Sequence, residues 1–320
     1  DSSDVRSRKI ALLYLLGACL MALPALLGGA WLWLIWISVS LLMVAFAYLT
    51  GNANVFQKQA NGKLSAAATV LLLPYLVGVR LNMAYWLRGK AKTAQVRHDV
   101  WIGSVLGISN HLPAVLDVCA EYPCRSHQGA YRALPLLDMA TPSENDLVQT
   151  ALILETLCQK HGKVLVCCAL GYGRSAAVVL TWLLVYGGCK DLAQTTAELK
   201  QIRPQIALPP ETARTVEAAA GRLKTSEASF AKTEKGTSVR NYPNKQALLD
   251  AVQTALKAAG IPTAVHYPIP LNKQPAVASD AVLPVGDLVA EEVLSLPMHP
   301  YMTEEQVRQV VGALAPVLSR

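Results

Sequence analysis

The stretch Val164-Leu-Val-Cys-Cys168-Ala-Leu-Gly-Tyr-Gly-Arg174-Ser175 decides how the centre of this chain folds. Its apolar start, Val164–Cys168, is typical of a buried strand, and the run Ala176–Tyr186 that follows it is typical of a helix. Gly171 and Gly173 allow backbone N–H groups between the two to converge on an oxyanion, and the helix N-terminus adds the positive end of its dipole. The sequence therefore predicts a phosphate-binding loop between a strand and a helix.

Two side chains give this loop its chemistry. Arg174 presents a planar guanidinium that matches two phosphate oxygens. The same positive field stabilises a thiolate, so Cys168 is expected to act as a nucleophile near neutral pH. The alternative is a buried cysteine before a helix whose first turn carries an arginine by chance. The ordered set of Cys, Gly, Gly, Arg and Ser between a strand and a helix favours the first interpretation.

This pattern resembles the Cys-x5-Arg-Ser/Thr signature of the cysteine-dependent protein phosphatases of the dual-specificity type, and the resemblance covers about residues 95–222. It implies an α/β fold with a central, mainly parallel sheet. It also implies that Cys168 attacks phosphorus, that Arg174 holds the phosphoryl group and that Ser175 assists turnover of the thiophosphate intermediate. The phosphate-binding residues implied are Ala169, Leu170, Gly171, Tyr172, Gly173 and Arg174.

One residue departs from the family pattern. The family usually has His directly before the nucleophile, and this chain has Cys167. Since that His orders the loop, the departure predicts weaker activity. Cys167 could instead form a reversible vicinal disulfide with Cys168, or it could be a small apolar strand residue.

A phosphatase also needs a general acid that protonates the leaving oxygen. The resemblance places it on a loop roughly thirty residues before the nucleophile, where Asp138 ends an apolar run just before a Pro-bearing loop. Asp146 is interpreted as a helix cap, and Asp117, inside an apolar strand, as structural. The Arg203-Pro204 pair resembles the family's element that supports the phosphate loop, although a helix stop at proline explains it equally well.

The N-terminal region is expected to be membrane-bound. No charged side chain occurs from Ile10 to Gln57, which is long enough for two spans, at about 10–28 and 31–50. Gly28-Gly29 would form the turn, beside the interfacial aromatics Trp31, Trp33 and Trp36. A buried soluble hairpin is the alternative. A third apolar segment, 64–87, contains Arg80 and could be another span or an interfacial helix.

The charge distribution and the cysteine spacing limit the kinds of partner and site that this chain is expected to have. Residues 1–100 contain ten Lys/Arg and three Asp/Glu, whereas the rest of the chain is nearly balanced. Basic residues beside an apolar region favour contact with anionic lipid and not with nucleic acid. They also place the flanks in the cytoplasm and the chain in a bacterial inner membrane, with a cytoplasmic catalytic domain. If segment 64–87 crosses the membrane, the catalytic domain lies outside. The seven irregularly spaced cysteines predict neither a disulfide framework nor a metal site.

The C-terminal region has a different character. After a Ser/Thr/Glu/Lys-rich linker the pattern predicts a helix (Asn244–Ala259), a strand (Thr263–Tyr267), a helix (Val285–Glu292) and a final helix that begins at a Thr303 capping box. The segments around His266-Tyr267 and His299-Pro-Tyr301 resemble the C-terminal end of the DegT/DnrJ/EryC1/StrS sugar aminotransferases, over about residues 238–318. Those enzymes use pyridoxal phosphate, but the large domain that holds it has no counterpart here, so no cofactor is expected. The two histidines are interpreted as packing and substrate-rim residues.

The expected organisation is a membrane region at 1–92, a phosphatase-like α/β domain at 93–223, a linker at 224–237 and a small α+β module at 238–320. The expected function is hydrolysis of phosphomonoesters on phosphoprotein or lipid. The loop interior contains no Lys, which favours a substrate with a single phosphate. Two alternatives remain: a fused or truncated relative of the aminotransferases that is inactive as a transaminase, and a membrane scaffold that binds phosphate without cleaving it.

Overall fold

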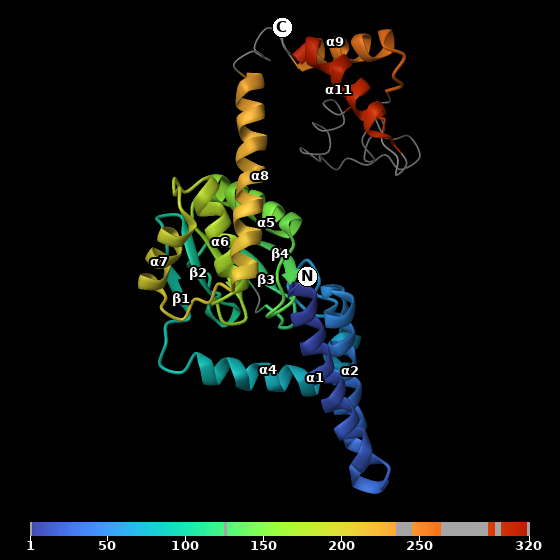
Figure 1. Cartoon of the computed structure of the whole chain (residues 1–320), viewed down its shortest axis with the longest axis vertical. Coiled ribbons are helices and arrows are strands. Elements are labelled where there is room, and N and C mark those ends of the chain that lie inside the picture. Colours follow the sequence, from blue (N-terminus) through green and yellow to red (C-terminus); the bar gives the residue numbers. More distant parts are fainter. Residues whose placement is uncertain (1, 125–126, 235–244, 264–293, 298–301, 319–320) are drawn as a thin grey trace, which may run out of the picture. The chain divides into compact units, whose positions relative to one another are not determined.

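The structure is a computed structural model that describes residues 2–124, 127–234, 245–263, 294–297 and 302–318. The chain divides into two compact units, residues 1–225 and 226–320. The first unit contains a mixed α/β domain and a pair of long apolar helices (Figure 1). The predicted α/β class is therefore confirmed for the central part of the chain.

A five-stranded sheet forms the centre of the first unit, in the order β1-β2-β5-β3-β4. The pairs β2–β5, β5–β3 and β3–β4 are parallel, and β1 alone runs antiparallel to its neighbour β2. Every residue of β5 and β3 is buried, as expected for central strands of a sheet covered on both faces. The strand bounds are Thr93–Gln95 (β1), Val100–Ser104 (β2), Ala114–Cys119 (β3), Ala130–Leu136 (β4) and Val164–Cys168 (β5).

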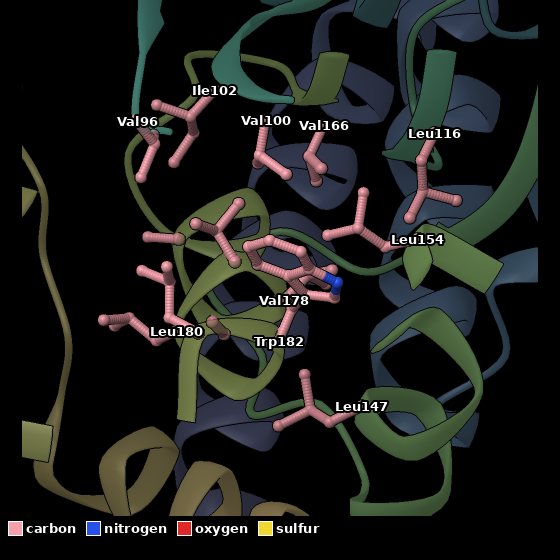
Figure 2. Close-up of a cluster of buried hydrophobic side chains, with 14 of the residues drawn as sticks. Val96, Val100, Ile102, Leu116, Leu147, Leu154, Val166, Val178, Leu180 and Trp182 are labelled. Carbon is pink, nitrogen blue, oxygen red and sulfur yellow. The ribbon is translucent and has the colours of Figure 1, made fainter. Parts of the chain in front are cut away.

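Helices cover one face of this sheet. Figure 2 shows the core between them, where Leu154 of α5 and Val178 and Trp182 of α6 pack against strand residues such as Val166. The indole N–H of Trp182 donates to Glu155 at 2.8 Å, so its one polar atom is satisfied. The helices of this region are α5 (Glu144–His161), α6 (Arg174–Val185), α7 (Leu192–Ile202) and α8 (Pro210–Glu234).

The second face of the sheet is covered by an N-terminal helix. Side chains alternate along β5, and Leu165 and Cys167 face away from α5 and α6. They lie in a cluster with Met83 and Leu87, which belong to the end of α4 (Leu73–Trp86) and the residue after it. The N-terminal region therefore completes the core of the α/β domain.

The two long apolar helices are α1 (Ser2–Ala25) and α2 (Trp33–Thr50), with a short 3-10 turn at Gly29–Leu32. The segments Val5–Ala25 and Gly29–Thr50 are long and apolar enough to cross a membrane, which by itself is weak evidence that they do so. The turn falls at Gly28-Gly29 as predicted, with both residues at positive φ (71° and 61°). The first helix begins before the predicted residue 10 and includes the basic residues that precede it.

The third apolar segment, 64–87, forms two helices. These are α3 (Ala66–Leu71) and α4, and they are separated at Leu72, just before the Pro74 that lies in the first turn of α4.

A buried ion pair joins the segment after α2 to the sheet. Lys58 Nζ lies 2.6 Å from Asp117 Oδ2, and neither side chain is exposed. The ammonium also donates to the carbonyl oxygens of Cys119 and Tyr122, and Tyr131 Oη donates to the same carboxylate at 2.6 Å. Asp117 therefore has the contacts of a structural residue.

We expect Lys58→Met to destabilise the first unit by about 3 kcal/mol, because it leaves a buried carboxylate without its counter-charge. The measurement is denaturant unfolding in detergent. The matched control is Lys63→Met, since Lys63 lies in the same segment but is exposed. Equal stability of the two variants would contradict this role for the Lys58–Asp117 pair.

The second unit contains α9 (Lys245–Ala258) and α11 (Glu304–Leu318), close to the predicted bounds. Thr303 and Gln306 exchange the expected capping-box hydrogen bonds. The division between the two units falls within the predicted linker at 224–237. The helix α8 continues through part of it to Glu234, because residues 225–234 contain neither Gly nor Pro to end it. Thr263 is not in a strand. The rest of the predicted strand, the helix Val285–Glu292, His266 and His299 lie outside the described residues.

Candidate functional site

The loop between β5 and α6 wraps around the Cys168 thiol. Cys168 is the last residue of β5 and is only 3% exposed. The Gly171 amide donates to Sγ at 3.2 Å, and the Ser175 hydroxyl lies 3.3 Å from the same sulfur. The N-terminus of α6 follows directly at Arg174. The sulfur therefore lies among donors and a positive helix end, which is an arrangement suited to a thiolate.

Gly171 is required by the shape of the loop. Its φ is 76°, in the left-handed region, and a Cβ at this position would lie 2.4 Å from the carbonyl carbon of Gly103 on β2. Any side chain at 171 would therefore push the loop off the sheet.

Arg203 holds the loop through hydrogen bonds to its carbonyl oxygens. Its Nε donates to the carbonyl oxygen of Gly171 at 3.0 Å, and Nη2 donates to that of Leu170 at 2.8 Å. Its guanidinium also lies 4.9 Å from the centre of the Tyr172 ring. These bonds hold the carbonyls of Leu170 and Gly171 toward Arg203, whereas the Gly171 N–H points to the Cys168 sulfur. They match the supporting role that the resemblance implied for the Arg203-Pro204 pair.

Arg174 is buried and forms a two-pronged ion pair with Glu121. Nη1 and Nη2 lie 2.6 Å from the two carboxylate oxygens, and Nη1 also donates to the carbonyl oxygen of Leu136 at 2.8 Å. Burial opposes ionisation of Glu121, but Arg174 outweighs it and lowers the pKa of the carboxyl. The buried Nε of Arg174 has no hydrogen-bond partner among the described residues, so one donor remains for a ligand.

Asp138 follows β4 and reaches the same guanidinium. Its Oδ1 lies 3.1 Å from Arg174 Nη2, and its own carbonyl accepts a hydrogen bond from the Tyr48 hydroxyl of α2 at 2.9 Å. The surrounding protein raises the pKa of Asp138 by withdrawing the carboxyl from water, Arg174 opposes this, and the charge of Glu121 adds to it. The carboxyl is nevertheless 48% exposed and can reach a ligand.

Asp146 lies elsewhere, in the capping box that it forms with Ser143 at the start of α5. This is the role predicted for it.

These groups meet in one cavity of about 450 Å³. Cys168, Arg174 and Asp138 all line it, together with Leu170, Tyr172 and Gly173 of the loop. Ser175 is fully buried beneath the sulfur. The structure thus brings together most of the residues singled out from the sequence, although Ala169 and Gly171 do not line the cavity.

Sequence reasoning missed four residues of this site. Glu121 pairs with Arg174 and neutralises its charge. The sequence signal that could have identified it is a polar residue just past the carboxyl end of a parallel strand. The other three line the cavity from the N-terminal region: Arg6 of α1, and Asn82 and Trp86 of α4. No sequence signal linked those helices to the loop, because the contact is made only in the folded unit.

Cys167 lies on the opposite face of β5 from Cys168, in the cluster that contains Leu165 and Met83. Its thiol is fully buried, and burial raises its pKa well above the usual range. Both thiols are free. This environment fits a small apolar strand residue better than a partner in a vicinal disulfide.

The Glu121–Arg174–Asp138 cluster leads to a prediction about pH. Glu121→Gln removes a negative charge that raises the pKa of Asp138, and it leaves Arg174 less neutralised. The pKa of Asp138 should therefore fall in this variant. If Asp138 must be protonated for turnover, the falling basic limb of the pH–rate profile should move to lower pH. The exposed Glu144→Gln is the matched control. A limb that stays in place or moves to higher pH would contradict this coupling.

Two family matches agree with this architecture. Residues 101–218 match the dual specificity phosphatase catalytic domain. Residues 214–315 match the DegT/DnrJ/EryC1/StrS aminotransferase family. Both resemblances inferred from the sequence are therefore confirmed.

Similar proteins fall into the same two groups. The UDP-2-acetamido-2-deoxy-3-oxo-D-glucuronate aminotransferase of Pseudomonas aeruginosa is 62% identical over 66 residues, 20% of this chain and 18% of that protein. A UDP-N-acetyl-3-dehydro-alpha-D-glucosamine aminotransferase of Acidithiobacillus ferrooxidans is 46% identical over 67 residues, again 20% and 18%. The chain thus spans less than a fifth of the length of these curated relatives.

Among solved structures, a mouse putative dual specificity phosphatase is 21% identical and covers 42% of this chain and 91% of its own, with a TM-score of 0.39. Human DUSP28 is 21% identical and covers 42% of this chain and 99% of its own, with a TM-score of 0.38.

Proposed function

We propose that this protein is a membrane-anchored, cysteine-dependent phosphatase that hydrolyses phosphomonoesters through a thiophosphate-enzyme intermediate. The observation that carries the proposal is that Cys168, Arg174 and Asp138 line one cavity. A nucleophile, a phosphate-binding cation and an acid in one cavity are the parts that this reaction needs.

In the first step the Cys168 thiolate attacks phosphorus, and the bond to the leaving oxygen breaks. The loop N–H groups and Arg174, through the Nε that pairs with none of the described residues, bind the phosphoryl oxygens as their charge grows. Asp138 gives its proton to the leaving oxygen, which departs as an alcohol or phenol. Its raised pKa keeps a larger share of the carboxyl protonated at neutral pH than an ordinary aspartate would have.

In the second step water attacks the phosphocysteine, and Asp138, now ionised, takes the proton from that water. The phosphorus–sulfur bond breaks, inorganic phosphate forms and the thiolate is restored. Ser175 lies 3.3 Å from the sulfur and can donate a hydrogen bond to the departing thiolate. This contact supports the role that the family resemblance gave it.

The experiment is release of phosphate from a small aryl phosphate by the full chain in detergent, with vanadate as inhibitor. Turnover blocked by vanadate is the expected result. A scaffold that only holds phosphorylated partners would bind vanadate in the same cavity without releasing phosphate, so that outcome would replace the phosphatase proposal.

Membrane anchoring is proposed on the two apolar helices, much of whose apolar surface is exposed. Along α1 and α2, residues such as Leu13, Leu20, Leu23 and Trp33 are more than half exposed. The basic residues near the start of α1 and after α2 favour a cytoplasmic catalytic domain in a bacterial inner membrane.

The C-terminal region is proposed to be inactive as a transaminase. Most of its described side chains belong to α9 and α11, which pack through a small apolar cluster that includes Leu256. In this part of the structure the described lysine side chain, Lys257, is exposed, so these residues do not fit a pyridoxal phosphate site. We expect no absorbance band of an internal aldimine when pyridoxal phosphate is added, and the appearance of one would contradict this reading.

A further inference from the structure

We infer that the substrate is a lipid phosphomonoester, taken by the cavity directly from an anionic bilayer on which α4 lies. This inference rests on the proposed phosphatase function and names its substrate class. It is carried by the two apolar faces of α4, by the charge around that helix and by the place where α4 meets the cavity.

The helix α4 is apolar on both sides, but only one side is covered. Leu76 and Met83 are buried against the rest of the unit. On the other side Leu73, Val77, Leu81 and Tyr85 recur every four residues and are 42%, 51%, 65% and 74% exposed. An apolar helix face of this kind requires a cover.

The geometry of α4 favours a bilayer surface as that cover. Since α3 and α4 together extend over residues 66–86, length alone does not exclude a third span; the placement of α4 does. Its inner face is committed to the catalytic domain, and it lies crosswise to the α1–α2 pair (Figure 1). If α1 and α2 span the membrane, α4 lies in the plane of its surface, and the alternative of a third span is not supported.

The charges around α4 complement anionic lipid head groups. From residue 5 to residue 98 the chain contains ten Lys/Arg and no Asp/Glu. Four of them, Arg80, Arg88, Lys90 and Lys92, lie in α4 or just after it. Such a basic segment beside an apolar face is attracted to the negative surface of a membrane.

The same helix forms part of the cavity wall. Asn82 and Trp86 of α4 and Arg6 of α1 line the cavity that contains Cys168. The Trp86 backbone also accepts a hydrogen bond from the hydroxyl of Tyr172 in the phosphate loop. A lipid can therefore place its phosphate at Cys168 while its acyl chains remain beside α4. The absence of Lys within the loop fits a single phosphate.

The test compares substrates presented to the full chain reconstituted in phosphatidylcholine vesicles. The lipid probe is diacylglycerol phosphate in the same vesicles, and the soluble probes are glycerol phosphate and a phosphotyrosyl peptide. We expect kcat/KM on the lipid to exceed that on either soluble probe by tenfold or more. A preference for the peptide, or equal rates on the lipid and on glycerol phosphate, would overturn the inference.

A paired variant tests the role of α4 itself. Val77→Glu with Leu81→Glu places two charges on the exposed face, and neither residue lines the cavity. We expect about a tenfold loss or more on the lipid, because two apolar side chains leave the bilayer, with aryl phosphate turnover unchanged.

The matched control is Leu152→Glu with Ile202→Glu, two exposed apolar residues of the catalytic domain (45% and 42%), which should change neither rate. If the two double variants hydrolyse the lipid at the same rate, the inference is overturned and the phosphatase proposal still stands. If the wild-type chain releases no phosphate from the aryl substrate, the phosphatase proposal itself is overturned.

Discussion

Replacement of Cys168 by Ser should reduce turnover of a small aryl phosphate by about 10⁴-fold or more, the scale at which loss of a covalent nucleophile acts. The hydroxyl is close in size to the thiol, so the contacts of the loop with Gly171 and Ser175 should persist. The variant should still bind vanadate, because the loop N–H groups and Arg174 remain. The measurements are initial rates of phosphate release and vanadate affinity on the same preparation.

Cys167→Ala is the matched control, since it removes the neighbouring thiol on the opposite face of β5. It should keep most of the activity and lose some stability. Undiminished turnover in Cys168→Ser would end the assignment of Cys168 as nucleophile. Inactivation by peroxide that disappears in Cys167→Ala would revive the vicinal disulfide and contradict our reading of Cys167.

The parts of the site that sequence reasoning predicted are those fixed by local spacing. The loop from Cys168 to Ser175 lies between strand and helix because an apolar five-residue run, two glycines and an apolar helix are consecutive in the chain. Asp138 was found by its distance from Cys168 and by the Pro-bearing loop after it. In both cases chain neighbours supply the geometry.

The parts that were missed depend on tertiary contacts. Glu121 reaches Arg174 because β3 and β5 are adjacent in a parallel sheet, a pairing that the sequence does not state. Arg6 and Trp86 reach the cavity because the N-terminal helices complete the core of the catalytic domain. Treating the membrane region and the phosphatase as separate domains hid this contact. The buried ion pair between Lys58 and Asp117 of β3 was missed for the same reason.

The extent of α8 was not predicted, for a different reason. Polar composition after Lys224 does not by itself end a helix, because a helix can continue through Ser, Thr, Glu and Lys when neither Gly nor Pro interrupts it. The helix α8 accordingly continues to Glu234.

Loss of the proposed acid should have the second largest effect. Asp138→Asn should lower the rate by about a hundredfold or more on a substrate with a poor leaving group, such as an alkyl or tyrosyl phosphate. The effect should be small on an activated aryl phosphate, whose departing oxygen hardly needs a proton. Asn also removes the group whose deprotonation slows the reaction. Because burial raises the pKa of Asp138, the wild-type rate should fall as pH rises through that value, and the variant should lack this basic limb.

Asp146→Asn is the matched control, since Asp146 lies just after the same connection, in the first turn of α5, where it completes the capping box. It should keep both the leaving-group dependence and the basic limb. The Arg174 contact also predicts that Asp138→Asn leaves vanadate affinity within a few fold, because an acid acts on the leaving oxygen while Arg174 holds the phosphoryl group. A large loss of vanadate affinity would mean that Asp138 positions Arg174. A leaving-group dependence carried by Asp146 would move the acid to that residue, and Cys168 would remain the proposed nucleophile in either case.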